Sequence, residues 1–118
     1  MNPIEEWWSF FHTNRFDTDW EELGLGDEDL ARLQRALVAA PEAGAVVAGA
    51  GGLRKLRFAR PGEGKSGSLR VGYALIPGRG LVLLMVVYGK STTTNFTPAD
   101  KRDIKRRLEQ LKAQVDLE

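Results

Sequence analysis

The run from Leu81 to Tyr88, LVLLMVVY, consists of eight apolar residues in succession. A strand with one wet face alternates apolar and polar residues, so an unbroken run predicts a strand that is covered on both faces. The run is far shorter than the roughly 18–20 residues that are needed to span a bilayer. We therefore expect a layered domain built around this strand.

Further strands are expected at residues 7–12, 54–60 and 69–76. Pro77–Gly80 reads as a hairpin connection between the last of these strands and the apolar run, and strands joined in this way are antiparallel. Because successive side chains of a strand point to opposite faces, Lys55 and Arg57 should share one face of the sheet and Arg54 should lie on the other.

Two helices are expected before the central strands. Thr18–Glu21, TDWE, has the pattern of a capping box and predicts a short helical turn that ends at Gly24. Asp27 is the predicted cap of a second helix, which Pro41 ends. Leucines at helical spacing predict its buried side: Leu30, Leu33 and Leu37.

A third helix should begin at Thr97–Pro98, with Thr97 as N-cap and Pro98 in the first helical position. Its expected apolar side consists of Ile104, Leu108, Leu111 and Val115. This order of elements predicts an α+β domain: a small twisted, mostly antiparallel sheet with two N-terminal-half helices and a C-terminal helix, all packed on one face. The 118 residues suit a single domain, 1–118.

Composition excludes several kinds of site. The chain contains no cysteine and one histidine, His12. Disulfides, thiolate nucleophiles, cysteine zinc sites and Ser–His or Cys–His pairs are therefore excluded. The segment 1–6 carries Glu5 and Glu6 before any apolar stretch, which is unlike a secretory signal, and we expect a cytoplasmic protein.

Charge is divided unevenly along the chain. Residues 1–48 hold three basic and ten acidic residues, a net charge of −7, whereas residues 49–118 hold 14 basic and six acidic residues, a net charge of +8. The segment Gly52–Lys90 alone carries +7. Such a division indicates a polyanion partner for one face, although strands and turns that merely carry solvated lysines and arginines would give the same count.

Several segments follow one another in a distinctive order. From Gly51 the chain reads GGLRKLRFARPGEGKSGSLRVGY, then LLMVVYGK, then NFTPADKRDIKRRLEQLK, after an upstream FDTDWEELGLGDEDLARLQRAL. These segments resemble the HigB-like branch of the RelE/ParE toxin superfamily over about residues 10–112. The chain departs from that pattern at Ser68, where a second glycine is common, and at Gly72, where a β-branched residue is common. A glycine at position 72 is expected to weaken its strand.

The resemblance implies a RelE-like fold and the toxin of a bacterial type II toxin–antitoxin pair. Such toxins are mRNA interferases, endoribonucleases that enter the A site of the 70S ribosome and cut mRNA there, which inhibits translation. They use no metal and no cofactor. A cognate antitoxin, which in this branch is usually a HigA-like helix-turn-helix protein, neutralises them. No membrane partner is implied.

The resemblance also implies the residues that act on RNA. The positions that match catalytic basic residues are Lys55, Arg57, Arg70 and Lys90. Arg70 is assigned to the scissile phosphate, and Lys55 is the first choice for proton transfer. The positions assigned to RNA binding are Lys65, Tyr73, Tyr88 and Arg54. Tyr73 is equally well explained as a core tyrosine. Arg54 alternates away from Lys55 and is better explained as a surface residue or a contact to ribosomal RNA. Arg60 and Arg79 are expected to be solvated.

Elementary chemistry supports this set of residues. RNA can be cut without a metal when its own 2′-hydroxyl attacks the adjacent phosphate, which requires proton transfers and cations on the phosphorane. His12 lies in the acidic half of the chain, far in sequence from the basic strands, and is expected to have a packing role. Lysines and arginines must then carry the reaction, and a lysine crowded by other cations releases its proton more readily.

Two alternatives remain. The ParE branch inhibits DNA gyrase without an enzymatic reaction, and a degenerate homologue would only bind the antitoxin. The basic strands and the basic C-terminal helix favour RNA as the target, because ParE-like members generally lack this cationic set.

Overall fold

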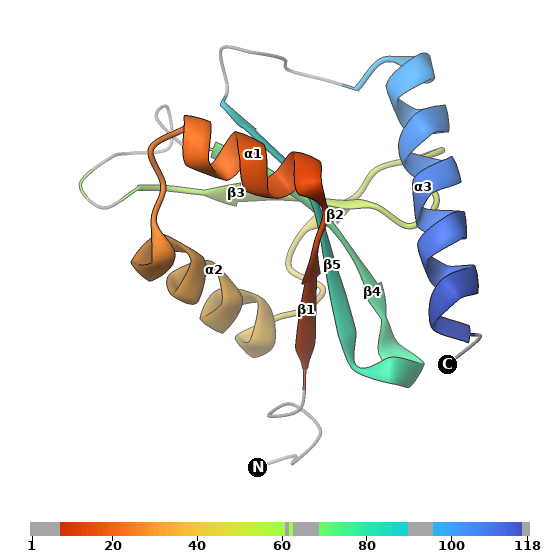
Figure 1. The fold of residues 1–118 in the computed structure, drawn as a ribbon, viewed down its shortest axis with the longest axis horizontal. Coiled ribbons are helices and arrows are strands. Elements are labelled where there is room, and N and C mark those ends of the chain that lie inside the picture. The colour runs from red at the N-terminus through yellow and green to blue at the C-terminus, as the bar shows by residue number, and fades with distance from the viewer. Residues whose placement is uncertain (1–7, 61, 63–68, 90–95, 117–118) are drawn as a thin grey trace.

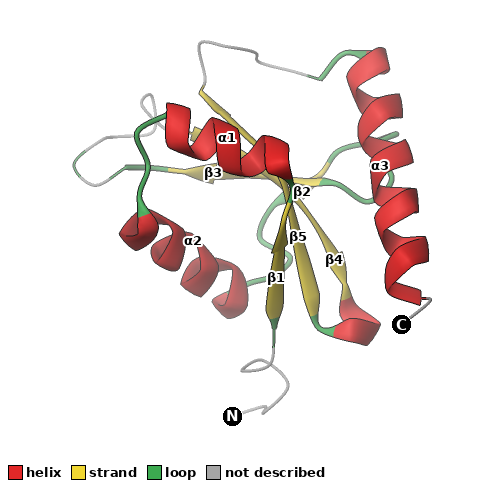
Figure 2. Cartoon of the chain, viewed as in Figure 1, coloured by secondary structure: helices red, strands yellow, loops and turns green. Residues whose placement is uncertain are grey.

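A computed structural model describes residues 8–60, 62, 69–89 and 96–116 of the chain. The order of elements is β1 (Ser9–His12), α1 (Asn14–Glu22), α2 (Asp27–Ala39), β2 (Ala45–Val46), β3 (Arg54–Phe58), β4 (Leu69–Ile76), a 3₁₀ turn (Pro77–Arg79), β5 (Leu81–Gly89) and α3 (Pro98–Asp116). The five strands form one sheet in the order β1-β5-β4-β3-β2 (Figures 1 and 2). None of the helices in the described ranges is long and apolar enough to cross a membrane.

The predicted α+β architecture is confirmed at this coarse level. β2 to β5 pair in antiparallel fashion, and β1 is the exception because it runs parallel to β5. The sheet is therefore mixed. A strand that is followed by a helix, rather than by a tight turn, is free to pair in parallel with a distant strand.

The prediction that β5 is covered on both faces is confirmed, since Val82–Val87 are all buried. Leu84 packs in a core cluster with residues of α1 and α2, whereas Leu83 packs in a second cluster with residues of α3. The expectation that all helices lie on one face of the sheet is wrong. α1 and α2 lie together, and α3 lies apart from them (Figure 1), because the apolar run of β5 needs a cover on each side.

The predicted start of α1 is also wrong. The helix begins at Asn14, with Thr13 rather than Thr18 as its N-cap. The Thr13 hydroxyl accepts a hydrogen bond from the Phe16 amide at 3.0 Å and donates one to the Met85 carbonyl at 2.7 Å. This threonine therefore caps the helix and ties it to β5, while Thr18 lies exposed inside the helix.

The other two helices begin close to where the sequence predicts. α2 begins at Asp27, but the capping contact is made by Asp29, whose carboxylate accepts a hydrogen bond from the Gly26 amide at 3.0 Å. α2 ends at Ala39, shortly before Pro41. At α3, Thr97 and Asp100 bond each other's amides at 3.1 Å, which is the reciprocal arrangement of a capping box.

Candidate functional site

Arg57, Arg70 and Tyr88 stand side by side across three neighbouring strands. Arg57 of β3 pairs with Arg70 of β4, and Arg70 pairs with Tyr88 of β5. Directly opposed residues on a sheet share a face, with Cβ atoms about 4.5–5.5 Å apart. Lys55 lies two residues before Arg57 and therefore points to the same face. We call these four residues the cationic face: Lys55, Arg57, Arg70 and Tyr88.

The cationic face lies on the side of the sheet that α3 covers in part. Leu69 and Val71 belong to the cluster beneath α1 and α2, so Arg70 between them points to the other side. Arg57 is exposed, and the other three residues of the face are partly buried. Farther along the same side, Ala74 and Leu83 are buried beneath α3. The apolar part of this side is thus covered, whereas Arg57 of the cationic face is exposed.

In the next row of the sheet, Gly72 of β4 pairs with Lys55 of β3 on one side and with Val86 of β5 on the other. A Cβ atom on Gly72 would lie 2.7 Å from Val86 Cγ2 and 3.4 Å from Leu53 Cδ1. The glycine that the sequence suggested would weaken β4 is therefore required for packing. It allows Leu53 and Val86 to close the core beside Lys55.

Tyr88 contributes a neutral hydrogen-bond donor. Its hydroxyl is buried and has no hydrogen-bond partner among the described residues. Burial raises the pKa of the Tyr88 phenol, and the positive charge of Arg70 opposes this shift to a smaller extent. Its ring meets the Phe96 ring edge-on, with centroids 5.4 Å apart. At neutral pH the side chain is thus held as a protonated phenol beside Arg70.

The cationic face is suited to bind an anion. Neither Lys55 nor Arg57 takes part in an ion pair with a described residue. Arg70 donates a hydrogen bond to the Leu69 carbonyl at 3.4 Å. Like charges opposite each other on a sheet repel, so an anion that binds both guanidiniums relieves this repulsion. A phosphate, with several acceptor oxygens, would accept hydrogen bonds from both guanidiniums together.

Tyr73 lies on the opposite face, and the structure supports its interpretation as a core tyrosine. The side chain is fully buried. Its hydroxyl donates to the Pro41 carbonyl at 2.7 Å and accepts from the Gly44 amide at 2.9 Å. Burial raises the pKa of Tyr73, and the hydrogen bond from Gly44 opposes this shift. A ring held in this way is not available to stack on a base.

Arg54 also lies on the opposite face, in register with Tyr73. Its Nη1 atom donates to the carbonyls of Glu42 and Gly44, at 3.1 Å and 2.9 Å. Arg54 therefore fastens the loop between α2 and β2 and lies apart from the cationic face. Alternation along β3 and β4 already separates both Arg54 and Tyr73 from Arg70. Two other predicted site residues, Lys65 and Lys90, lie outside the described residues.

Two arginines that the sequence did not assign to a contact, Arg32 and Arg60, make specific hydrogen bonds. Arg60, expected to be solvated, is half-buried and donates from Nη2 to the Leu23 carbonyl at 2.6 Å. Arg32 donates from Nη1 to the Ala59 carbonyl at 2.9 Å. Their partners are backbone carbonyls that lie 37 and 27 residues away in sequence, so no pattern of residues predicts these contacts.

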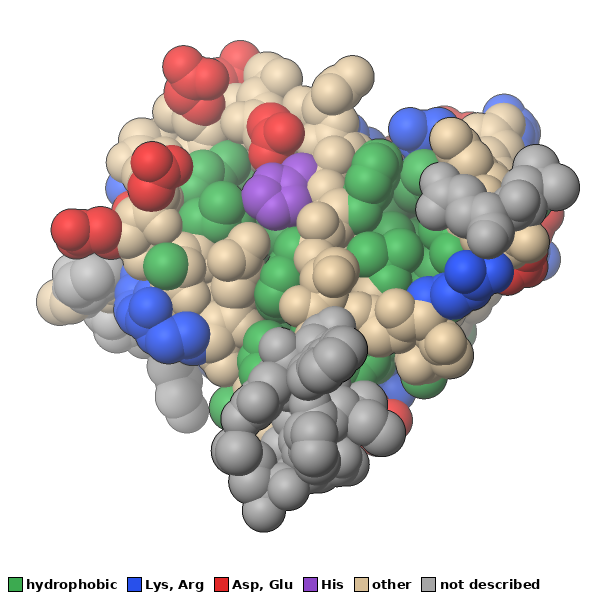
Figure 3. All heavy atoms as spheres, turned by 60° about the horizontal axis from the view of Figure 1, so that its bottom comes forward, with side chains coloured by type: hydrophobic (Ala, Val, Ile, Leu, Met, Phe, Trp, Pro, Cys, Tyr) green, Lys and Arg blue, Asp and Glu red, His purple; other side chains and the backbone are tan. Residues whose placement is uncertain are grey.

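The acidic residues of α1 and α2 and the cationic face lie on different sides of the sheet. α1 and α2 carry seven acidic residues, Asp17, Asp19, Glu21, Glu22, Asp27, Glu28 and Asp29. Figure 3 shows acidic side chains gathered on one part of the surface. His12 also lies on this side, with Nδ1 3.0 Å from Asp17 Oδ1 and its ring against Phe16. The acidic helices and the cationic face therefore present different surfaces to a polyanion.

No protein-family model matches the chain. Within the described residues, no group of three or more histidine, aspartate or glutamate side chains is placed to hold a metal ion. The interpretation of the site accordingly depends on the geometry of the cationic face.

Proposed function

We propose that the protein is a toxin of a type II toxin–antitoxin system with a RelE-like fold, and that it acts as a ribosome-dependent, metal-independent mRNA endonuclease in the cytoplasm. One observation carries the proposal. Lys55, Arg57, Arg70 and Tyr88 come from three strands and are up to 33 positions apart in sequence, yet they share one face in adjoining rows.

The reaction suits a face that supplies cations. The 2′-oxygen of the substrate bonds to phosphorus as the bond from phosphorus to the 5′-oxygen breaks, which leaves a 2′,3′-cyclic phosphate and a 5′-hydroxyl. Arg57 and Arg70 stabilise the charge that develops on the phosphorane. Tyr88, whose hydroxyl is buried, is proposed to pack beside Arg70 and help hold it in place.

Two protons must move in this reaction. One leaves the attacking 2′-hydroxyl, and one reaches the departing 5′-oxygen. We assign Lys55 to one of these transfers, since it is the amine of the cationic face. Lys90 and Lys65, which the sequence also assigns to RNA, are proposed to complete the site.

The proposed partners are mRNA on the 70S ribosome and a cognate antitoxin, a HigA-like helix-turn-helix protein. An electrostatic field does not distinguish carboxylate from phosphate, so an acidic antitoxin segment would be attracted to the same face. We propose that this segment lies on or beside the sheet near Lys55, Arg70 and Lys90.

Induction of the protein without its antitoxin tests the proposal. Incorporation of labelled amino acids should stop soon after induction, while DNA synthesis continues. Continued protein synthesis with a loss of DNA synthesis would assign the protein to the gyrase inhibitors instead. Normal growth with intact antitoxin binding would indicate a degenerate homologue.

A further inference from the structure

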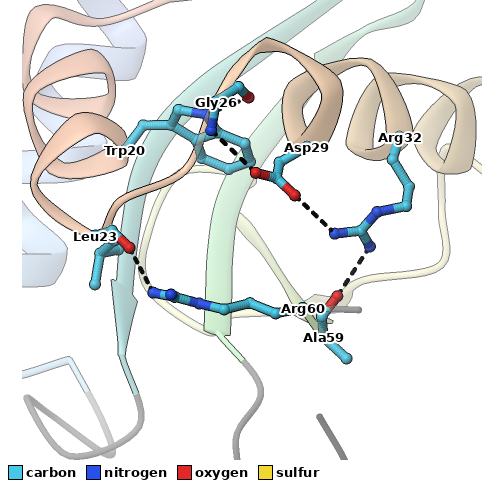
Figure 4. Close-up of polar contacts among 7 residues, drawn as sticks. All are labelled: Trp20, Leu23, Gly26, Asp29, Arg32, Ala59 and Arg60. Carbon is cyan, nitrogen blue, oxygen red and sulfur yellow. Dashed lines mark hydrogen bonds and ion pairs between the residues drawn. The ribbon is translucent and has the colours of Figure 1, made fainter. Parts of the chain in front are cut away.

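The corner between α1 and α2 is joined to the end of β3 by a network that we call the arginine clasp: Asp29, Arg32 and Arg60 with the backbone groups that they bind (Figure 4). Arg32 donates to the Ala59 carbonyl at 2.9 Å and to Asp29 Oδ1 at 3.3 Å. The other oxygen of Asp29 accepts from the Gly26 amide. The clasp thus connects a helix start to a strand end.

Arg60 closes the clasp from the side of β3. Its guanidinium donates to the carbonyl of Leu23, the C-cap residue that follows α1. Nearby, the Trp20 indole N–H donates to the Gly26 carbonyl at 3.2 Å. The same corner of the chain is therefore held to residues 59 and 60 by two separate guanidiniums.

Phe58, the last residue of β3, contacts two flat groups. Arg32 Cζ stands 4.2 Å from the centroid of the Phe58 ring. The Trp20 ring stacks with Phe58, with centroids 6.1 Å apart. Phe58 is buried, so these contacts fix the strand end in a defined position.

This anchoring matters because the outer side of β3 is only partly paired. Among the described residues, β2 pairs with Arg54 and Lys55 but extends no farther. Arg57 lies beyond that pairing and immediately before the residues that the clasp holds. On its inner side it pairs with Arg70. The clasp is thus the outer support of the strand segment that carries Arg57.

We propose that Arg32 and Arg60 are positioning residues that hold Arg57 in line with Arg70 for phosphate binding, an inference that rests on the proposed function. Both guanidiniums are bound to backbone carbonyls. They belong to the side of the sheet that packs on α1 and α2, because Arg32 lies over Phe58 of that core. They therefore act through β3 and not by contact with RNA.

A double-mutant cycle between Arg32 and Arg57 tests this proposal, with the single-turnover rate of mRNA cleavage on programmed ribosomes as the readout. Arg32→Ala should lower the rate about 10- to 100-fold, the scale expected when a reacting group is misplaced by about 1 Å. In an Arg57→Ala background the same change should cost less than about 3-fold, because Arg32 acts through Arg57. Equal losses in both backgrounds would overturn the proposal, as would a wild-type rate for Arg32→Ala.

Matched variants separate positioning from general damage. Arg35→Ala removes an exposed arginine from the same helix and should leave the rate unchanged. Arg32→Lys retains a donor for the Ala59 carbonyl but loses the planar fork, so its rate should lie between those of wild type and Arg32→Ala. If Arg32→Ala fails to fold, Arg32→Lys and Arg60→Ala take its place in the cycle. Each should again lower the rate less in the Arg57→Ala background than in the wild-type background. Equal losses in the two backgrounds would contradict the proposal.

Amide hydrogen exchange gives a second readout that does not depend on activity. The amides of residues 56–58 should exchange at least about tenfold faster in Arg32→Ala than in Arg35→Ala, while those of residues 82–87 remain protected. Unchanged exchange at residues 56–58 would overturn the proposal. If the wild-type protein leaves mRNA intact, the proposed function fails, and the exchange measurement still decides whether the clasp positions β3.

Discussion

Arg70 occupies the centre of the cationic face, between Arg57 on one side and Tyr88 on the other. Arg70→Ala should abolish toxicity, because loss of one donor to a developing oxyanion lowers a rate by about 10²–10³. The variant should remain folded and should still bind the antitoxin. Arg79→Ala, which removes an exposed arginine from the turn before β5, is the control and should remain toxic. Full toxicity of a soluble Arg70→Ala protein would remove Arg70 from the site.

Gly72 leaves no room for a side chain on its strand. Gly72→Ala places a Cβ atom 2.7 Å from Val86 Cγ2, so we expect a loss of about 1–3 kcal/mol in the free energy of unfolding. Gly78→Ala adds a Cβ atom where no heavy atom lies within 4 Å and should change stability little. Thermal unfolding of the two variants makes the comparison. Equal melting temperatures would contradict the packing role of Gly72.

At the level of single residues, the alternation of side chains along a strand correctly predicted which residues of β3 share a face. It placed Lys55 and Arg57 on one face and Arg54 on the other, as the structure does. For Tyr73 the sequence could not choose between a core tyrosine and a base-stacking one, and the structure shows a buried side chain on the face opposite Arg70. The contacts of Arg32 and Arg60 were beyond prediction, since their partners are backbone carbonyls that any residue supplies.

α1 depends on a threonine that serves two elements. Thr13→Ala removes both the helix cap and the hydrogen bond to the Met85 carbonyl, and should lower the free energy of unfolding by about 1–3 kcal/mol. Thr13→Ser keeps the hydroxyl and should restore most of this loss. Thr18→Ala, at the cap suggested by the sequence, should have little effect. If Thr18→Ala proved the more damaging in chemical denaturation, the helix start described above would be incorrect.

α3 should respond to acid through its capping box. The hydrogen bond from the Thr97 amide, and then that with the Thr97 hydroxyl, hold the pKa of the Asp100 carboxyl below its usual value of 3.8. A lowered folded-state pKa stabilises the protein above the unfolded-state pKa, and this contribution is lost as pH falls through the folded value. Wild type should therefore exceed Asp100→Asn in melting temperature at about pH 6, and the difference should shrink at about pH 3. Asp103→Asn is the control on the same helix, and a constant difference between pH values would contradict the account.

The end of a helix could be predicted where the residues that determine it are close together in sequence. The start of α3 was predictable because its cap lies within four consecutive residues, Thr97 to Asp100. The start of α1 was not, because the choice between Thr13 and Thr18 is made by a carbonyl of β5, 72 residues from Thr13. The end of α2 before Pro41 followed from proline's own geometry.

On the scale of the whole molecule, the sheet separates an acidic side from a cationic one. The unbroken apolar run of β5 already called for cover on both faces of the sheet, but the apolar stripe of a helix does not say which face that helix covers. The parallel pairing of β1 with β5 joins residues that are far apart in sequence, so no local pattern predicted it.

This separation predicts how an acidic antitoxin would associate. Charge reversal at Lys55 and Arg57 together should slow the association at low salt, because exposed cations steer an acidic partner and are screened as ionic strength rises. Reversal of Glu21 and Glu28, which are exposed on α1 and α2, is the matched control and should not slow the association. Stopped-flow binding at two salt concentrations makes the measurement. Slower association after reversal of Glu21 and Glu28, with no change after reversal of Lys55 and Arg57, would place the antitoxin on the acidic helices.

The chemistry of the RNA ends tests the central claim most directly. mRNA recovered from programmed ribosomes after exposure to the wild-type protein should carry new 5′-hydroxyl ends and matching 2′,3′-cyclic phosphates, the products of attack by the 2′-hydroxyl. The same ends should be missing after exposure to folded Arg70→Ala or Lys55→Met protein. Intact mRNA after exposure to the wild-type protein would contradict the account, as would fragments with 5′-phosphate ends.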